Sequence, residues 1–277
     1  MTSPQSSPGL LTRDGLSVLT WAVFDRLPLD AAVTTRDGGV SAGEYASLNL
    51  GLHVGDRPDD VIENRRRAAA VLASELGDLV FCSQRHGRDV AVVGPCDRGR
   101  GTFDHADAIP CDALVTGSPE VGLVVMVADC VPLVLYDPRA HVLGCVHAGW
   151  GGTTKGITTA AVEAMCGVGA TASSIVAGIG PAITADRYQV GENVVDAARD
   201  RFGGDVDGIV RPDGTGRWTF DLWAANHRLL VEAGVQPGNI EVSAVGTGPG
   251  APFYSDRAGR PCGRFAALAR LRPRGDR

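Results

Sequence analysis

The middle of the chain carries the feature that most limits its fold, a series of four short apolar segments rich in valine and leucine. They span residues 113–116, 122–128, 132–136 and 142–146. Polar and apolar residues alternate only weakly in them, which is typical of strands buried on both faces. Helical periodicity surrounds this centre. We therefore expect a single α+β domain with mixed sheets of α/β type, in which central β layers are flanked by helices.

The remaining segments complete this expected domain. Further strands are predicted at residues 16–24, 31–35, 79–83, 89–93, 175–179 and 240–245. Helices are predicted at residues 59–76, 155–166, 193–202 and 221–233, with a last short helix at 263–271. Asp221 is a suitable N-cap residue for the helix it precedes. We expect residues 1–15 to be a flexible N-terminal tail and residues 16–272 to form a single catalytic domain.

Composition excludes several classes of partner. The net charge of −6 argues against a nucleic-acid binder, which normally presents a basic face. No apolar run approaches the roughly 20 residues that cross a membrane, and no secretory signal is recognised. The seven cysteines are irregularly spaced, as expected for reduced thiols in a cytoplasm. We expect a cytoplasmic monomer that acts on a small molecule.

Three apolar segments end in a residue that can bind a metal, and a tight turn with glycine or proline follows each. These turns are Gln84-Arg85-His86-Gly87, Ala128-Asp129-Cys130-Val131-Pro132 and Val146-His147-Ala148-Gly149-Trp150. Two imidazoles and one thiolate suit zinc or copper. Three protein ligands leave a fourth zinc position open for water, as in catalytic sites. The spacing is not a regular motif, and each residue alone also has an ordinary structural explanation, such as core packing for a buried cysteine.

The other histidines lie outside this pattern. His53 and His105 fall in predicted loops, His141 in a turn and His227 on a helix face. We expect surface or structural roles for all four.

An ordered series of motifs resembles the YfiH family of purine nucleoside phosphorylases, formerly described as laccase-like or multicopper polyphenol oxidases. The matches run from Thr34 to about Leu271. They include Thr34-Thr35-Arg36, Gly38-Gly39-Val40-Ser41, Ser47-Leu48-Asn49-Leu50-Gly51, Val54-Gly55-Asp56, Glu63-Asn64-Arg65, Gln84 with His86-Gly87, Asp112-Ala113-Leu114-Val115-Thr116, Ala128-Asp129-Cys130 with Pro132, His147-Ala148-Gly149-Trp150, Gly178-Ile179-Gly180-Pro181, Phe220-Asp221-Leu222 and Gly263-Arg264.

The resemblance implies that His86, Cys130 and His147 form the zinc site of the family. The implied activity is phosphorolysis of adenosine, inosine and methylthioadenosine, with deamination of adenosine as a side activity. A peptidoglycan-editing amidase, assigned to some members, is an alternative. The chain departs from the family pattern at Gly151 and Ala258, where the family carries arginine, and at Gly246, where it carries cysteine. The two lost cations predict weaker phosphate binding.

Roles for neighbouring residues follow as hypotheses. Arg36 is the candidate phosphate ligand, because guanidinium binds oxyanions in a bidentate way. Asn49 would hydrogen-bond the sugar or the base. Asp129 would shuttle a proton or orient a metal ligand.

Two other reaction classes remain open. Cys130 could act as the nucleophile of a metal-free thiol hydrolase, with His147 as its base. A copper-dependent phenol oxidase could use Met126 as an axial ligand. The six histidines are too few for a multicopper cluster, and Met126 is better explained by core packing.

Overall fold

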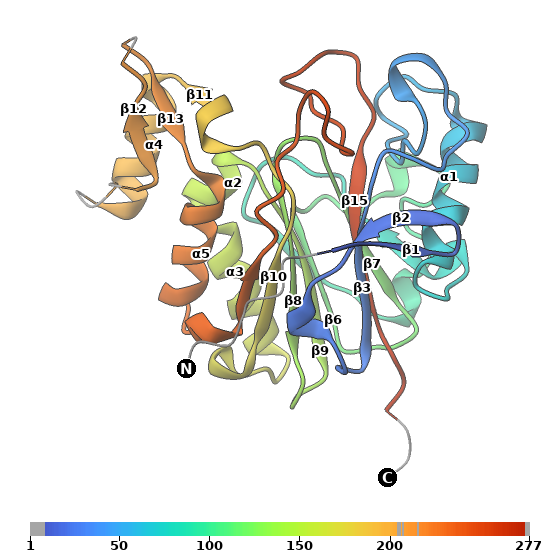
Figure 1. The fold of residues 1–277 in the computed structure, drawn as a ribbon. Coiled ribbons are helices and arrows are strands. Elements are labelled where there is room, and N and C mark those ends of the chain that lie inside the picture. The colour runs from blue at the N-terminus through green and yellow to red at the C-terminus, as the bar shows by residue number, and fades with distance from the viewer. Residues whose placement is uncertain (1–8, 204–205, 207, 215, 275–277) are drawn as a thin grey trace.

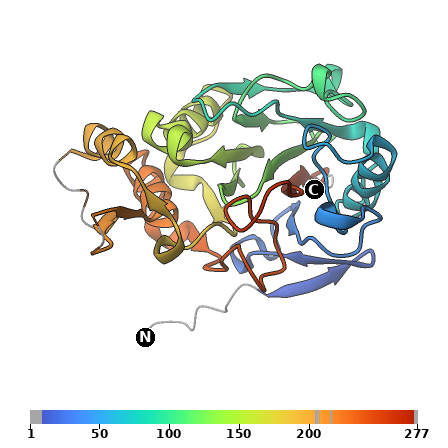
Figure 2. The ribbon, with the colours of Figure 1, turned by 90° about the horizontal axis from the view of Figure 1, so that it is seen from above.

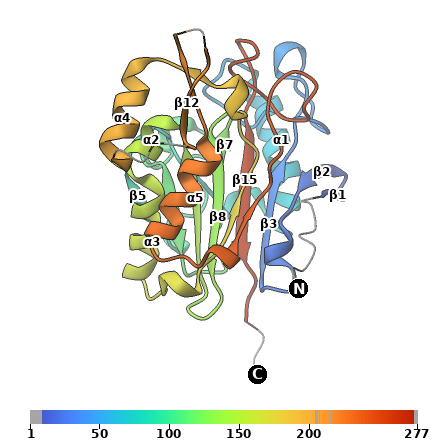
Figure 3. The same cartoon turned by 60° about the vertical axis from the view of Figure 1, so that its left-hand side comes forward.

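Two six-stranded sheets pack face to face, and helices cover the outer face of each (Figures 1 and 3). The computed structural model describes residues 9–203, 206, 208–214 and 216–274. The result is one mixed α/β domain with four layers, which confirms the expected class of fold. No helix in the described ranges is long and apolar enough to cross a bilayer.

The strands have the following bounds: β1 Leu10–Arg13, β2 Leu16–Leu19, β3 Leu29–Thr34, β4 Leu79–Phe81, β5 Val90–Val92, β6 Ala113–Thr116, β7 Gly122–Val127, β8 Val131–Asp137, β9 Val142–Ala148, β10 Val176–Ile179, β11 Gln189–Val190, β12 Val210–Pro212, β13 Trp218–Phe220, β14 Ile240–Val242 and β15 Phe265–Leu271. The α-helices are α1 Pro58–Ala70, α2 Trp150–Lys155, α3 Ile157–Gly167, α4 Glu192–Phe202 and α5 Leu222–Glu232.

The first sheet has the order β1-β2-β3-β15-β7-β4 and is buried on both faces. In β7, Leu123 and Val125 pack into the core between the sheets, whereas Val124 and Met126 pack on the opposite side with residues of α1. Strands that lose water on both faces need no polar alternation, and this explains the uniform apolar runs of the sequence.

The second sheet has the order β14-β10-β8-β9-β6-β5, and helices α2, α3 and α5 lie along its outer side (Figure 1). Residues of α3 and α5 share one apolar core with the outward side chains of β8 and β9. Asp221 caps α5 as predicted, since its carboxylate accepts a hydrogen bond of 2.9 Å from the N–H of Ala224. A small third sheet, β11-β13-β12, projects with α4 at one end of the molecule (Figure 2).

The predicted last helix at residues 263–271 is wrong, because this segment is the strand β15. Alanines at three of its positions favour a helix locally. However, β15 lies between β3 and β7, where its alternate side chains enter two different cores. Phe265 and Ala267 enter the core between the sheets, and Leu268 packs on the side of α1. Burial on both faces therefore overrides the local propensity.

Other boundaries also differ from the predictions. The helix predicted at 155–166 is α3, which begins at Ile157 because Gly156 adopts a left-handed conformation with φ of 84°; the preceding helix α2 was not predicted. The helix predicted at 59–76 ends at Ala70, and the strand predicted at 16–24 ends at Leu19. Within the predicted tail, Leu10–Arg13 pair with β2 as strand β1, while residues 1–8 lie outside the described part of the chain.

Candidate metal centre and active site

Strand directions bring three potential metal ligands to one edge of the sandwich. Strands β4 and β7 are parallel, so both end at this edge. Strand β8 begins there, and β9, which runs antiparallel to β8, ends there. His86 follows β4, Cys130 lies in the turn between β7 and β8, and His147 is the penultimate residue of β9. The prediction that these three candidate ligands lie where strands end is confirmed.

The three side chains converge at a distance that suits a metal ion. Their ligand atoms all lie within 4.8 Å of one another, and the Cys130 Sγ is 3.7 Å from the His86 Nε2. A tetrahedral zinc ion with bonds of about 2.0–2.3 Å separates its ligands by roughly 3.5 Å. The donor set and spacing therefore fit zinc after a small contraction.

The backbone at this edge is strained at two positions. His86 and Asp129 adopt positive φ angles of 54° and 86°. Such conformations are unfavourable for residues other than glycine and persist where the surroundings enforce them, commonly at functional sites. In both places the strain turns the chain so that a candidate ligand, His86 itself or the next residue Cys130, lies at the cleft.

Gly149 leaves room for the three ligands. A Cβ atom at this position would lie 2.8 Å from both the Cys130 Sγ and the His86 Cδ2. Any other side chain would therefore push these ligands apart.

Asp112 connects two of the ligands to the sheet. It is buried, and its Oδ1 accepts a hydrogen bond of 2.8 Å from the Nδ1 of His147, whose Nε2 is left for a metal. The same carboxylate accepts hydrogen bonds from the backbone N–H groups of Arg85, His86 and Gly87. Burial alone would raise the pKa of Asp112, but the hydrogen bonds from His147 and Gly87 lower it overall. Carboxylates that orient metal-binding histidines in this way are typical of protein zinc sites.

The metal-free site holds a separated charge. Burial alone would raise the pKa of Cys130, but His147 and His86 outweigh it and lower this pKa to about 6. Burial alone would lower the pKa of His147, but Cys130 and Asp112 raise it to about 9. At neutral pH a thiolate therefore faces an imidazolium, and the thiolate is the form that binds metals.

The three ligands open into a cleft of about 1070 Å³. Aromatic side chains and arginines share its wall: the lining residues include Trp150, Tyr188, Arg257, Arg260 and Arg264. His53 and His105, which were expected to have surface or structural roles, line it as well. His141 does have a structural role, since it hydrogen-bonds to Tyr136 and to the backbone of Arg272.

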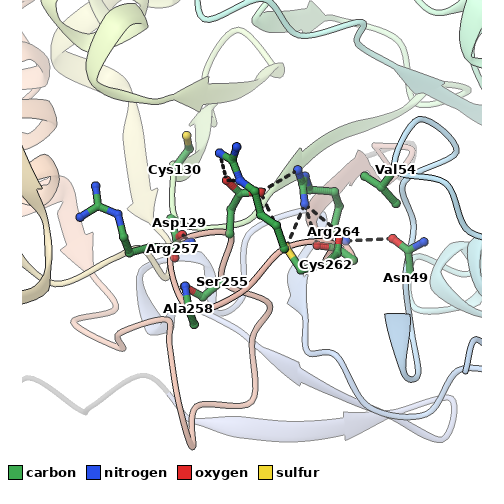
Figure 4. A network of polar contacts seen from close by, with 12 residues as sticks. Asn49, Val54, Asp129, Cys130, Ser255, Arg257, Ala258, Cys262 and Arg264 are labelled. Carbon is green, nitrogen blue, oxygen red and sulfur yellow. Dashed lines mark hydrogen bonds and ion pairs between the residues drawn. The ribbon is translucent and has the colours of Figure 1, made fainter. Parts of the chain in front are cut away.

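Asp129 lies in the cleft wall, next to Cys130, and holds the surrounding loops (Figure 4). Its carboxylate accepts hydrogen bonds from the hydroxyl of Thr247 and, at 2.7 Å, from the N–H of Arg257. Both oxygens are engaged. This arrangement favours orientation of the Cys130 turn over proton transfer.

Arg36 and Asn49, the predicted substrate ligands, are not among the residues that line the cleft. Arg36 donates two hydrogen bonds to the carbonyl of Ala46 and lies over the ring of Tyr254. Asn49 is fully buried and accepts the N–H of Arg264 at 2.9 Å, so it joins two loops. The structure uses both side chains to hold loops in place.

Sequence reasoning missed the contribution of Asp112, Tyr188 and the three cleft arginines. Asp112 and Arg264 each stood in a matched motif, and Asp112 also directly precedes a strand of buried residues. Tyr188 and Arg257 reach the cleft through loops that are distant in the sequence, and no spacing rule indicates their position.

Fold and site together define a class of protein: a two-sheet α/β sandwich with a His₂Cys group at the edge of its central strands, inside a basic cleft. The chain matches the family described as multi-copper polyphenol oxidoreductase laccase over residues 30–272, and it belongs to this family. The resemblance predicted from the motifs is thereby confirmed.

Relatives and solved structures agree with this placement. A protein of Geobacillus stearothermophilus named purine nucleoside phosphorylase YlmD is 41% identical over 242 residues, which is 86% of this chain and 88% of the relative. A protein from an unknown prokaryotic organism named adenosine deaminase RL5 is 39% identical over 213 residues, 76% of this chain and 81% of the relative. The crystal structure of YlmD from G. stearothermophilus has a TM-score of 0.88 at 36% identity, covering 96% of this chain and 100% of that one. The YfiH structure from Bacillus licheniformis has a TM-score of 0.86 at 34% identity, covering 92% and 96%.

Proposed function

We propose that the chain is a zinc-dependent purine nucleoside phosphorylase for adenosine, inosine and methylthioadenosine, with deamination of adenosine as a side activity. The observation that carries the proposal is the convergence of His86, Cys130 and His147 within 4.8 Å, in a cleft that arginines also line. The names of the relatives, phosphorylases and one adenosine deaminase, support it.

Each part of the cleft has a role in this proposal. His86, Cys130 and His147 would hold zinc, which when bound supplies an electrophile that stabilises developing negative charge. Tyr188 and Trp150 offer aromatic faces against which a purine can pack. The cleft volume of about 1070 Å³ is sufficient for a nucleoside and an inorganic anion.

Phosphorolysis needs positive charge in a second place. An oxygen of orthophosphate forms a bond to the anomeric carbon as the carbon–nitrogen bond breaks, and the electron pair leaves with the purine. The oxyanion must be held close to the sugar, which guanidinium groups do well. The cleft is lined by three arginines, Arg257, Arg260 and Arg264. In this proposal they replace the two arginines of the family pattern that are Gly151 and Ala258 in this chain.

A second candidate is a thiol-dependent amidase that edits peptidoglycan precursors. Its support is the low pKa of Cys130, to which a hydrogen bond with His147 contributes. Asp112 in turn orients His147. This order of nucleophile, base and orienting group is the one that thiol hydrolases need. A chelator would abolish the phosphorylase, whereas a thiol alkylator acting on zinc-free protein would abolish the amidase.

Copper chemistry has less support. Among the described residues, one group of three side chains is arranged to hold a metal, so a multicopper cluster lacks further ligands there. Met126 is buried in β7, and its sulfur accepts a hydrogen bond from Arg65, as expected for a packing role.

We also propose a cytoplasmic location, because all seven cysteines are free, and a monomer as the working unit.

One incubation tests the main proposal. Zinc-loaded protein is mixed with adenosine, with and without phosphate, and the products are separated by chromatography. We expect adenine and ribose 1-phosphate only when phosphate is present, and inosine in both cases. The Cys130→Ala variant should lose zinc and both activities. Full turnover by zinc-free protein, or no turnover by zinc-loaded protein, would contradict the proposal.

A further inference from the structure

The wall of the cleft differs on its two sides. In Figure 4, Arg264 and Val54 lie on one side of the drawn network, while Arg257 and Cys130 lie on the other. His53, which precedes Val54, and His105 line the cleft together with Arg264. We refer to His53, His105 and Arg264 as the histidine corner.

Some hydrogen-bond donors at this corner have no acceptor among the described residues. The rings of His53 and His105 lie 4.8 Å apart between centroids and are tilted by 32°. No residue in the described ranges hydrogen-bonds to either ring. Arg264 donates hydrogen bonds from its Nη1 to the carbonyls of Cys262 and Gly263 and from its Nη2 to Asp256. Its Nε has no acceptor among the described residues. Polar groups that converge on a cleft without partners indicate a polar ligand.

The charges at this corner favour an anion. Asp256 is shared between Arg260 and Arg264, so one carboxylate faces two guanidinium groups. Arg65 is buried behind the wall, where it donates to backbone carbonyls and has no acidic partner among the described residues. Asp104 is the acidic neighbour of His105.

The histidines respond to the same positive field. Burial in the cleft wall, then His105, Arg264 and Arg65, lower the pKa of His53 to about 4. Burial and Arg65 also lower the pKa of His105, although Asp104 acts in the opposite direction. Both imidazoles are therefore neutral at pH 7, and each can donate one N–H.

We infer that the histidine corner binds the orthophosphate co-substrate, with Arg264 supplying the charge and His53 and His105 supplying neutral donors. This inference rests on the proposed function. Phosphate offers acceptor oxygens in several directions, which a guanidinium and two imidazoles can contact together. The purine then takes the side of Tyr188 and Trp150, and the sugar lies between the two.

The test compares Arg264→Gln and the double variant His53→Asn/His105→Asn with His227→Asn, a matched control on α5, whose histidine is not among the lining residues. KM is measured for phosphate and for adenosine, together with zinc content and phosphate-independent deamination. Direct binding of inorganic phosphate to zinc-loaded protein is measured by calorimetry.

We expect Arg264→Gln to raise KM for phosphate at least about tenfold, equivalent to about 1.4 kcal/mol. The double variant should raise it several-fold, and the control should not change it. KM for phosphate should rise by a larger factor than KM for adenosine, and zinc content should stay close to wild type, which a general loss of structure would not allow.

The outcomes separate the inference from the proposed function. If wild-type protein performs phosphorolysis and both variants keep its KM for phosphate, the inference is wrong and the function stands. If wild-type protein performs none, the function is wrong and calorimetry decides: phosphate binding that the variants lose supports the corner, and absence of binding overturns it. If the variants bind adenosine 5′-monophosphate less tightly than wild type but bind free phosphate equally well, the corner serves a phosphate ester. The inference is then wrong.

Discussion

The Nδ1 of His147 lies 2.8 Å from the Oδ1 of Asp112, and this buried pair fixes the candidate metal centre to the sheet. Asp112 directly precedes β6, whose first residue is paired with Val146, the residue before His147. The same carboxylate holds the loop of His86 through backbone N–H groups. One side chain therefore sets the position of two of the three ligands.

Replacing Asp112 by asparagine should weaken zinc binding about 10- to 100-fold, the usual effect of losing a carboxylate that orients a metal-binding histidine. The amide cannot accept all the N–H groups that the carboxylate accepts, so the His86 loop should also loosen. Competition with a chelator of known affinity measures the change. Asp137→Asn is the control, since Asp137 is equally buried and accepts N–H groups of Arg139 and Thr171 away from the cleft. Equal zinc affinities in the two variants would contradict the assigned role.

Zinc binding to metal-free protein should release protons in a pH-dependent manner. His147 is protonated below about pH 9, and Cys130 is deprotonated above about pH 6. Ligation needs neutral imidazole and thiolate. Between these values, binding should displace about one proton, from His147. The affinity should therefore fall as the pH drops below about 9, and more steeply below about pH 6, where a second proton must leave Cys130. Calorimetry in buffers of different ionisation enthalpy counts the protons, and a count near zero at pH 7.5 would show that the charge separation is absent.

Gly149→Ala should disturb the ligands while the fold remains intact. The added methyl would lie 2.8 Å from the Cys130 Sγ, so the thiol or His86 must move. We expect lower zinc affinity and activity, with a circular dichroism spectrum like that of wild type. Gly167→Ala is the matched control, because its added Cβ meets no atom within 4 Å. Wild-type zinc affinity in Gly149→Ala would show that the ligands have more freedom than the structure indicates.

Arg36→Ala should lower stability without changing the use of phosphate. The variant loses two hydrogen bonds to Ala46 and the contact with the Tyr254 ring. We expect about 1–3 kcal/mol less free energy of unfolding and an unchanged KM for phosphate. Denaturant titration and steady-state kinetics measure the two quantities. Arg88→Ala, which removes an exposed ion pair with Glu163, should change stability by less than about 1 kcal/mol. A selective rise in KM for phosphate would return Arg36 to the substrate site.

Some parts of this structure were readable from the sequence because they depend on local or repeated patterns. The buried strands β7, β8 and β9 were predicted from uniform apolar runs, and α5 from its N-cap Asp221. His86, Cys130 and His147 stood out because each followed an apolar run and preceded a turn. In these places the chemistry of neighbouring residues is sufficient to specify the structure.

Tertiary structure alone decided the rest, because the deciding contacts join residues far apart in the chain. Segment 263–271 is a strand because β3 and β7 lie on both sides of it. Arg36 is held by Ala46 and Tyr254, while Arg264, which is more than 200 residues away along the chain, lines the cleft instead. The sequence by itself determined which residues can bind a metal and which segments are buried. Packing of the two sheets and their loops determined which of its many charged side chains line the cleft, because position in the fold, and not residue type, decides whether a guanidinium reaches it.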